Sequence, residues 1–340
     1  MIAENPASAS VALTRKDFQS DQQVKWCPGC GDYSILAALQ TTLPKLGIKK
    51  ENIAIISGIG CSSRFPYYMD TYGFHTIHGR ACAVATGVKA ANPELSVWVI
   101  TGDGDALSIG GNHTMHALRR NVDLKIMMFN NEIYGLTKGQ FSPTSTVGLK
   151  TKTSPMGNID LPANPIALAL GSGATFVART ADNDVKHLTS ILEAAAAHKG
   201  TAFIEILQNC VIFNDGAHDD FYSTANRKEK VIYLEDGKPL TYAGGTKGIA
   251  ASGFGTLASI DLAEGEEGKA IVHNAAEPTG TLAYALSRFS HPEMPVPLGI
   301  FRKVEAPVYH ESMDAQIEAA KAKKAPDLQK LLSGGVTWKV

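Results

Sequence analysis

The fold is decided by two neighbouring stretches, VWVITGDGDALSIGG at residues 97–111 and LKIMMFNNEIYGLT at residues 124–137. Each contains an apolar run that predicts a strand, over Leu95–Thr101 and over Leu124–Phe129. The residues between the two runs, Leu107–Arg120, predict a helix that carries an internal Gly-Gly pair. A strand, a helix and a second strand in this order are typical of a parallel sheet covered by its crossover helices.

The remainder of the first 215 residues continues this alternation. Further strands are predicted at Asn52–Ser57, Ala174–Ala178 and Ala202–Leu207, and helices at Gly79–Ala91 and around Asp184–His198. The strands are apolar throughout, which indicates that both faces of the sheet are buried. We therefore expect an α/β fold in which a parallel sheet has helices on both faces.

The chain divides into three parts in this interpretation. Residues 1–25 contain no apolar core flanked by basic residues, so they predict an N-terminal arm and no signal peptide. Residues 26–215 carry the alternating strands and helices and form the expected ligand-binding domain. Residues 216–340 show a weaker pattern, with a helix over 313–332, and we expect them to pack on the same domain as an extension.

The composition narrows the class of protein. The chain has 340 residues, of which 44% are hydrophobic and 19% are charged, and its formal net charge is −1. These values are typical of a globular protein with a large core, and they give no electrostatic support for a nucleic-acid or acidic-membrane partner. No apolar run approaches the length of a membrane span. We expect a cytoplasmic protein with no membrane or nucleic-acid partner.

Polar residues follow the two strands that decide the fold, at the point where each strand ends. Asp103 lies in Gly-Asp-Gly-Asp after the first strand, and Asn131 ends the pair Asn-Asn after the second. Ligands of open α/β sheets bind at the carboxyl ends of the strands. Gly102 and Gly104 let backbone approach a bulky anion, and both polar side chains offer the oxygen ligands that Mg²⁺ prefers. The segment therefore predicts a site for Mg²⁺ and a diphosphate.

This pair of motifs resembles the fingerprint of the thiamine-diphosphate enzymes, which is GDG followed after a helix by NN. The resemblance implies that Asp103, Asn131 and the carbonyl of Ile133 hold Mg²⁺. It also implies that the diphosphate is lined by Gly104, Asp105, Gly135 and Leu136. These enzymes need a second sheet domain that holds the aminopyrimidine and supplies a glutamate. Since the chain shows only the diphosphate half, the resemblance implies a partner chain.

Four of the five cysteines form a second candidate site. Cys27 and Cys30 form a CxxC pair before a helix-like run, and Cys61 and Cys210 each follow a predicted strand. In a reducing compartment such cysteines indicate metal or redox chemistry. The residues leave open an iron–sulfur cluster, a zinc site, a thioredoxin-like pair and a disulfide, although the pair leaves Cys61 and Cys210 unexplained. The fifth cysteine, Cys82, is expected to be a small packed residue.

Seven stretches along nearly the whole chain together resemble the β subunits of the 2-oxoacid:ferredoxin oxidoreductases, most closely those of the 2-oxoglutarate type. They are WCPGCGD (26–32), GIGCSSR (58–64), HGRACAVATG (78–87), GDGDALSIGGNH (102–113), NNEIYGLTKGQ (130–140), QNCVIFND (208–215) and PLGIFRKVEAPVY (297–309). The resemblance implies that Cys27, Cys30, Cys61 and Cys210 hold a [4Fe–4S] cluster close to the thiamine.

The same resemblance implies further residues at the cofactor. Two groups are expected beside the thiamine: Ile59, Gly60, Cys61 and Ser62, and His78, Gly79 and Arg80. Arg64 is expected either to bind a substrate carboxylate through its planar fork or to form a surface ion pair, and the sequence favours neither.

The implied activity is an oxidoreductase reaction. A 2-oxo acid, CoA and oxidised ferredoxin would give acyl-CoA, CO2 and reduced ferredoxin, and the direction could reverse. The implied cofactors are thiamine diphosphate, Mg²⁺ and a [4Fe–4S] cluster, with CoA as co-substrate. The implied partners are an α (or fused α/γ) subunit and ferredoxin, in a dimer of αβ heterodimers.

Three alternative functions stay open at this point. They are a pyruvate or broader 2-oxoacid:ferredoxin oxidoreductase β subunit, a non-catalytic zinc-stabilised subunit, and a thiamine-dependent decarboxylase or synthase without redox chemistry.

Overall fold

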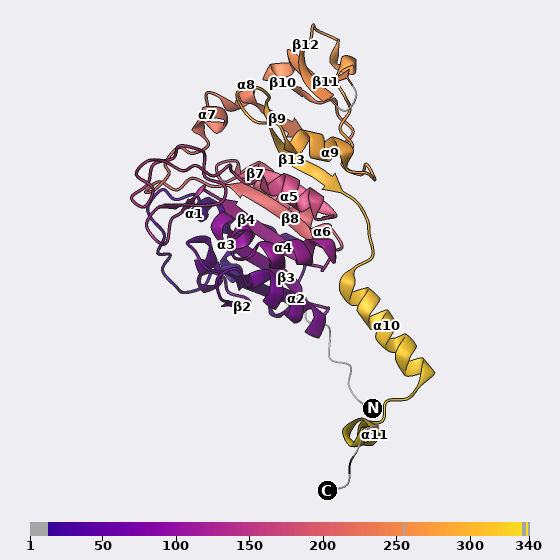
Figure 1. The fold of residues 1–340 in the computed structure, drawn as a ribbon. Coiled ribbons are helices and arrows are strands. Elements are labelled where there is room, and N and C mark those ends of the chain that lie inside the picture. The colour runs from indigo at the N-terminus through magenta and orange to yellow at the C-terminus, as the bar shows by residue number, and fades with distance from the viewer. Residues whose placement is uncertain (1–12, 254–255, 335–337, 339–340) are drawn as a thin grey trace.

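The computed structural model describes residues 13–253, 256–334 and 338. Its centre is an eight-stranded sheet with the strand order β2-β1-β3-β4-β8-β7-β13-β9 (Figure 1). The strands are β1 (Ile53–Ser57), β2 (Tyr72–His75), β3 (Ser96–Gly102), β4 (Lys125–Asn130), β7 (Phe176–Ala181), β8 (Ala202–Leu207), β9 (Val231–Leu234) and β13 (Val296–Lys303).

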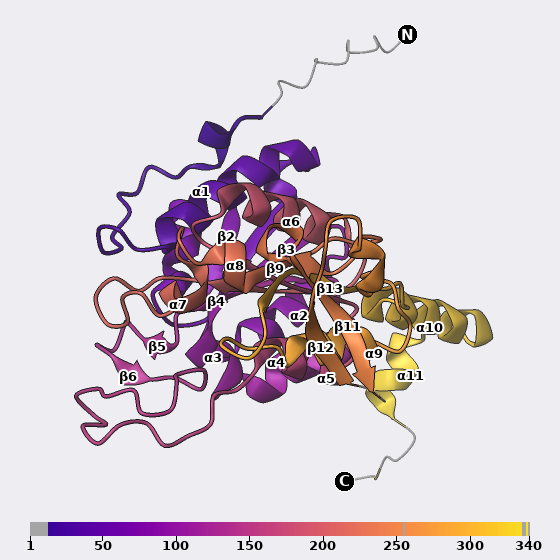
Figure 2. The ribbon, with the colours of Figure 1, turned by 90° about the horizontal axis from the view of Figure 1, so that it is seen from above.

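The central strands of this sheet are buried on both faces, whereas the edge strand β2 is mostly exposed. Neighbouring residues of a strand point to opposite sides, so each central strand contributes to two cores. On β1, Ile53 and Ile55 belong to one hydrophobic core, and Ala54 and Ile56 belong to the other. Figure 2 shows helices on the two sides of the sheet. The first core contains side chains of α1 (Asp32–Thr42) and α6 (Val185–Ala197). The second contains side chains of α2 (Ala81–Ala91), α4 (Gly111–Arg119), α5 (Pro165–Gly171) and α9 (Thr281–Ser287).

The strand directions explain what the sequence could and could not predict. Six strands, from β2 to β7 in the sheet order, run parallel as expected. At the other edge β13 runs antiparallel to β7, and β9 runs parallel to β13. These two strands come from residues 216–340, so part of the expected extension completes the main sheet. The division of the chain near residue 215 stays a prediction.

Shorter elements surround the sheet. A hairpin of β5 (Ile133–Tyr134) and β6 (Gln140–Phe141) follows β4, and an antiparallel sheet contains β10 (Thr241–Tyr242), β11 (Lys247–Gly253) and β12 (Thr256–Asp261). The remaining helices are α3 (Asp103–Leu107), α7 (Asp219–Tyr222), α8 (Arg227–Lys230), α10 (Tyr309–Lys323) and α11 (Leu328–Ser333). The 3-10 helices are η1 (Arg15–Phe18), η2 (Leu43–Leu46), η3 (Lys50–Asn52), η4 (Ser62–Tyr68), η5 (Ala243–Gly245) and η6 (Glu267–Lys269).

The helix expected over Leu107–Arg120 is two helices, so this prediction is wrong in its boundaries. The chain breaks between α3 and α4, and a Cβ on Gly110 would lie 2.3 Å from the carbonyl oxygen of Asp105. A glycine is therefore needed where the two helices approach each other. The helix expected over 313–332 is likewise two, α10 and α11, with Pro326 between them.

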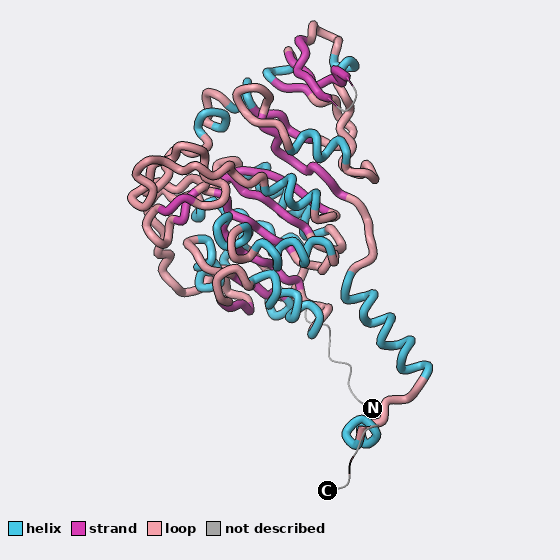
Figure 3. The backbone as a smooth tube through the Cα atoms, in the orientation of Figure 1, coloured by secondary structure: helices cyan, strands magenta, loops and turns pink. Residues whose placement is uncertain are grey.

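The two ends of the described chain differ in how they pack. The C-terminal helices α10 and α11 extend away from the sheet (Figure 3), and His310 is the buried residue of α10. Near the other end, within the expected N-terminal arm, Phe18 of η1 is fully buried in the core beside α1.

Among the described residues, every helix is too short or too polar to cross a membrane.

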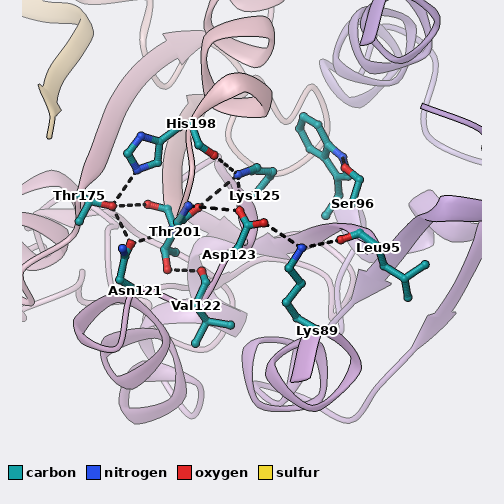
Figure 4. Close-up of polar contacts among 12 residues, drawn as sticks. Lys89, Leu95, Ser96, Asn121, Val122, Asp123, Lys125, Thr175, His198 and Thr201 are labelled. Atoms are coloured by element: carbon teal, nitrogen blue, oxygen red, sulfur yellow. Dashed lines mark hydrogen bonds and ion pairs between the residues drawn. The ribbon is translucent and has the colours of Figure 1, made fainter. Parts of the chain in front are cut away.

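A buried polar network lies at the edge of the sheet where the central strands begin (Figure 4). The carboxylate of Asp123 binds Lys89 Nζ at 2.8 Å and Lys125 Nζ at 2.7 Å, and both lysines are buried. Nearby, Thr175 Oγ1 lies 2.8 Å from Nε2 of His198. Burial and the charge of Lys125 lower the pKa of His198 to about 4, so this imidazole is neutral at pH 7. The network ties together the starts of β4, β7 and β8, opposite the candidate active site.

Candidate active site

A cleft lies at the carboxyl ends of β1, β3 and β4. Most residues expected at a cofactor or at Mg²⁺ line it: Ile59, Gly60, Cys61, Ser62, His78, Gly102, Asp103, Gly104, Asp105, Asn131, Ile133, Gly135 and Leu136. Five residues that the sequence did not single out complete the lining: Asp32, Phe129, Tyr134, Thr137 and Gln208. Residues far apart in the chain therefore meet here, because parallel strands end at the same edge.

Asp103 is held from one side by hydroxyl groups. It follows β3 directly and is almost fully buried. Its Oδ2 accepts hydrogen bonds from Ser142 Oγ at 2.5 Å and from Thr144 Oγ1 at 2.6 Å. Burial raises the pKa of Asp103, and the two hydroxyls act in the opposite direction. The loop after β6 thus fixes the orientation of this carboxyl group beside the cleft.

Asn131 lies in a sharp turn after β4. Its Oδ1 accepts a hydrogen bond from the N–H of Ile133 at 3.2 Å, and its carbonyl accepts one from Nδ2 of Asn214 at 2.9 Å. Glu132 has a φ of 57°, which is uncommon for a residue other than glycine. This turn brings the backbone from Ile133 to Gly135 to the wall of the cleft.

Asp105 anchors the loops around the cleft. Its Oδ1 accepts hydrogen bonds from the N–H of Gly79 at 2.7 Å and the N–H of Ile59 at 3.1 Å, and it lies 2.6 Å from Nδ1 of His78. Its Oδ2 accepts a hydrogen bond from Thr101 Oγ1 at 2.7 Å. The carboxylate therefore joins the Gly58–Ser62 loop, the His78–Arg80 loop and the end of β3.

Two glycines set the shape of the cleft wall. A Cβ on Gly104 would lie 2.2 Å from the ring of Tyr134, whose hydroxyl donates a hydrogen bond to the Gly104 carbonyl at 3.1 Å. A Cβ on Gly135 would lie 3.5 Å from Sγ of Cys61 and 3.6 Å from Sγ of Cys210. The absence of a side chain at Gly104 lets the β5 strand pack against α3.

The four cysteines expected to act together gather at one corner of the cleft. Cys61 and Cys210 flank Gly135, Cys30 receives a hydrogen bond from Gln208, and the N–H of Cys30 donates to the carbonyl of Cys27 at 3.1 Å. Cys27 is exposed and the other three are partly buried. Within the described part of the chain, no three His, Cys, Asp or Glu side chains converge as ligands of a single metal ion. Cys82 is buried elsewhere, in α2.

The surroundings of Cys30 and Cys61 favour the protonated form of these two thiols. Burial, followed by the charge of Asp32, raises the pKa of Cys30 and raises that of Cys61 to about 12. A negative charge on the neighbouring Cys210 sulfur would raise both pKa values further. Burial also raises the pKa of Asp32 to about 7, and neither of its carboxyl oxygens has a hydrogen-bond partner among the described residues. A metal that binds Cys30 and Cys61 would therefore have to displace the protons of these two thiols.

Apart from the cluster cysteines Cys27, Cys30 and Cys210, three expected residues lie outside the lining of the cleft. Gly79 is bonded to Asp105, and Arg80 donates from Nη1 to the carbonyl of Ile109 at 3.3 Å. Arg64 donates from Nε to the hydroxyl of Tyr68 at 3.2 Å, within η4. The two roles expected of Arg64 stay predictions.

Comparison with known proteins gives the family. Residues 58–206 match the family model described as the thiamine pyrophosphate enzyme, C-terminal TPP binding domain. The 2-oxoglutarate oxidoreductase subunit KorB of Mycobacterium tuberculosis is 54% identical over 331 residues, which cover 96% of this chain and 88% of that relative. The 2-oxoacid:ferredoxin oxidoreductase 1, subunit beta, of Aeropyrum pernix is 49% identical over 230 residues, covering 68% of this chain and 70% of that relative. The chain belongs to the β subunits of the 2-oxoacid:ferredoxin oxidoreductases.

A solved structure of the same family supports the fold. The 2-oxoglutarate:ferredoxin oxidoreductase from Magnetococcus marinus, with 2-oxoglutarate, coenzyme A and succinyl-CoA bound, superposes with a TM-score of 0.76 at 34% identity. The match covers 94% of this chain and 95% of that one. The family, the α/β fold class and the assignment as an oxidoreductase subunit are therefore confirmed. The individual site residues stay predictions.

Proposed function

We propose that this β subunit belongs to a 2-oxoglutarate:ferredoxin oxidoreductase, which converts 2-oxoglutarate and CoA to succinyl-CoA and CO2 and passes the electrons to ferredoxin. The observation that carries the proposal is the position of Gly135. This residue lines the cleft, and a Cβ added to it would be in van der Waals contact with the sulfur atoms of Cys61 and Cys210. A cofactor in the cleft and a cluster on the cysteines would be immediate neighbours, which favours fast electron transfer between them.

The donor atoms at Asp103 fit Mg²⁺ and a diphosphate. Mg²⁺ takes oxygen ligands, usually one or two carboxylates together with phosphate oxygens and water. Asp103, the amide of Asn131 and the carbonyl of Ile133 would supply the protein oxygens. Gly104 and Gly135, which present backbone without side chains, would line the diphosphate.

The loops joined by Asp105 would hold the thiamine. The loop at Ile59–Ser62 and the loop at His78–Arg80 lie against the same carboxylate. Asp105 would therefore act by orienting these loops, since its oxygens already accept hydrogen bonds from them and from Thr101.

The cysteine corner fits a [4Fe–4S] cluster. Such a cluster takes one thiolate at each iron, so its four ligands surround a body larger than a single ion. Cys27, Cys30, Cys61 and Cys210 supply that number of thiols at one corner of the cleft. When bound, thiamine diphosphate would supply an electron sink as the substrate loses CO2, and the cluster would accept electrons singly.

The rim of the cleft supports a partner chain. Ile59 and Leu136 line the cleft and are exposed. Ile77, which precedes His78, and Ile109, which lies against Gly79, are exposed as well. Clustered exposed apolar residues are typical of a surface that another chain covers. We infer that an α subunit covers this rim with its aminopyrimidine-binding domain, and that two αβ pairs assemble. Ferredoxin would approach near Cys27, the exposed cysteine, in the cytoplasm.

The substrate assignment has one competing candidate. Several relatives are 2-oxoacid:ferredoxin oxidoreductase β subunits, which favours pyruvate or a broader substrate range as the second candidate. Arg64 would bind the substrate carboxylate if its side chain turned from Tyr68 toward the cleft.

The proposal is tested on the complex of this chain with its α partner, purified without oxygen. We expect about four irons and four sulfides per αβ pair, as the cluster type requires, and CoA-dependent reduction of methyl viologen with 2-oxoglutarate. Faster reduction of methyl viologen with pyruvate would overturn the assignment of 2-oxoglutarate as the substrate but would leave the proposed mechanism in place. Zinc in place of iron and sulfide would overturn the proposed function.

A further inference from the structure

Gln208 is a buried side chain that touches both candidate sites. It follows β8, and only 1% of its surface is exposed. Its Oε1 accepts a hydrogen bond from Nδ2 of Asn131 at 2.8 Å. Its Nε2 donates to Sγ of Cys30, with 3.3 Å between nitrogen and sulfur. One carboxamide therefore links the residue expected at Mg²⁺ with a residue expected at the cluster.

The orientation of this carboxamide is fixed by the rest of its contacts. Its Nε2 also donates to the carbonyl of Asn209, which only an N–H group can do. Its backbone N–H donates to the carbonyl of Asn130 at 2.9 Å. The oxygen of Gln208 must then face Asn131, and its N–H must face Cys30.

Each end of Gln208 has a consequence for the group beside it. By accepting from Nδ2 of Asn131, it acts together with the Ile133 N–H, which donates to Oδ1, to fix the orientation of the Asn131 amide. An N–H group directed at a cluster thiolate favours the reduced state, because the added electron increases the negative charge on sulfur.

We propose that Gln208 is a positioning residue that orients Asn131 for Mg²⁺ and raises the reduction potential of the cluster through Cys30. This inference rests on the proposed function, because it needs a cluster at the cysteines. A single buried side chain would then hold Asn131 and Cys30 in fixed relative positions and adjust how readily electrons move from one site to the other.

The test uses the αβ complex carrying Gln208→Met, which fills a similar volume without a donor or an acceptor. Gln40→Met is the matched control, since Gln40 is also buried but donates to the carbonyl of Tyr68, away from both sites. We expect Gln208→Met to lower the midpoint potential of the cluster in a titration followed by electron paramagnetic resonance. We also expect several-fold weaker binding of thiamine diphosphate with Mg²⁺, measured by calorimetry. Gln40→Met should leave both values as in the wild type.

The outcomes separate this inference from the proposed function. Absence of iron and sulfide from the wild-type complex would overturn the proposed function. A wild-type cluster with an unchanged potential in Gln208→Met would overturn the role of Gln208 alone. If that variant loses its cluster or fails to fold, the wild-type complex is labelled with glutamine carrying 15N in the side chain. Pulsed resonance of the reduced cluster should then detect a coupled amide 15N, and its absence would overturn the inference.

Discussion

Removal of the Asp105 carboxylate should disturb three parts of the cleft at once. Asp105→Ala takes away the acceptor for the N–H of Gly79, the N–H of Ile59 and the hydroxyl of Thr101, and it also removes the partner of His78. The first and third of these contacts are buried, so water cannot replace the lost oxygen there.

The magnitude follows from the two buried donors. Each buried donor left without a partner costs about 1–3 kcal/mol, so we expect Asp105→Ala to lower the free energy of unfolding by about 2–6 kcal/mol. Asp105→Asn keeps an acceptor for the three groups at Oδ1, and its NH2 group would face Thr101, whose hydroxyl can also accept. That variant loses only the charge, and we expect a cost of about 1–2 kcal/mol.

Urea unfolding followed by tryptophan fluorescence measures this difference, since Trp98 is buried on the same strand as Thr101. Glu193→Ala is the control, because its ion pair with Lys45 is exposed and should contribute no more than about 1 kcal/mol. Thiamine diphosphate should bind Asp105→Ala more weakly in the αβ complex. A loss of stability no larger than that of the control, with unchanged cofactor binding, would refute the role of Asp105 as a shared anchor.

The remaining predictions concern the cleft wall, the opposite edge of the sheet and the cysteines. Gly104→Ala places a Cβ 2.2 Å from the ring of Tyr134, so calorimetry should show about tenfold weaker binding of thiamine diphosphate. Gly87→Ala is the control and should leave the binding unchanged, because no atom lies within 4 Å of its added Cβ. Asp123→Asn leaves two lysines buried without a counter-charge, and urea unfolding should show a loss of about 3–5 kcal/mol at pH 7. Burial raises the pKa of Asp123, but the lysines lower it to about 2, below its ordinary value of 3.8. Its stabilisation is therefore complete above the ordinary value and is lost as the pH falls toward 2, so the gap between the variant and the wild type should narrow at pH 3. Cys210→Ser should lose iron and sulfide in a colorimetric assay, whereas Cys82→Ser should keep both.

The sequence predicted the central strands well for a physical reason. β3, β4 and β8 are buried on both faces, so each is a mainly apolar run, although β8 contains the buried Glu205. The ends of such strands share one edge of the sheet, so the sequence alone predicts that Asp103 and Asn131 lie close together. Most of the residues expected from the family resemblance line the cleft for the same reason, because they follow strands that end at this edge.

The rest depends on contacts that leave no local pattern. Gln208 follows a strand as an ordinary polar residue, and its link between Asn131 and Cys30 arises only when three segments meet. Ser142 contacts Asp103 from a loop whose sequence carries no motif. Asp105 was expected at the diphosphate and lines the cleft, but its hydrogen bonds to neighbouring loops could not be predicted from the sequence. Strands β9 and β13 went unpredicted because they join the sheet at its edge from a distant part of the chain.

If the cleft and the cysteine corner act as one electron-transferring site, as we propose, the visible absorption of the oxygen-free αβ complex should respond to substrate. After addition of 2-oxoglutarate and CoA, we predict that the absorption of the cluster bleaches, and that bleaching requires thiamine diphosphate and Mg²⁺. A colourless protein, or a coloured one that no 2-oxo acid bleaches in the presence of both cofactors, would contradict the account.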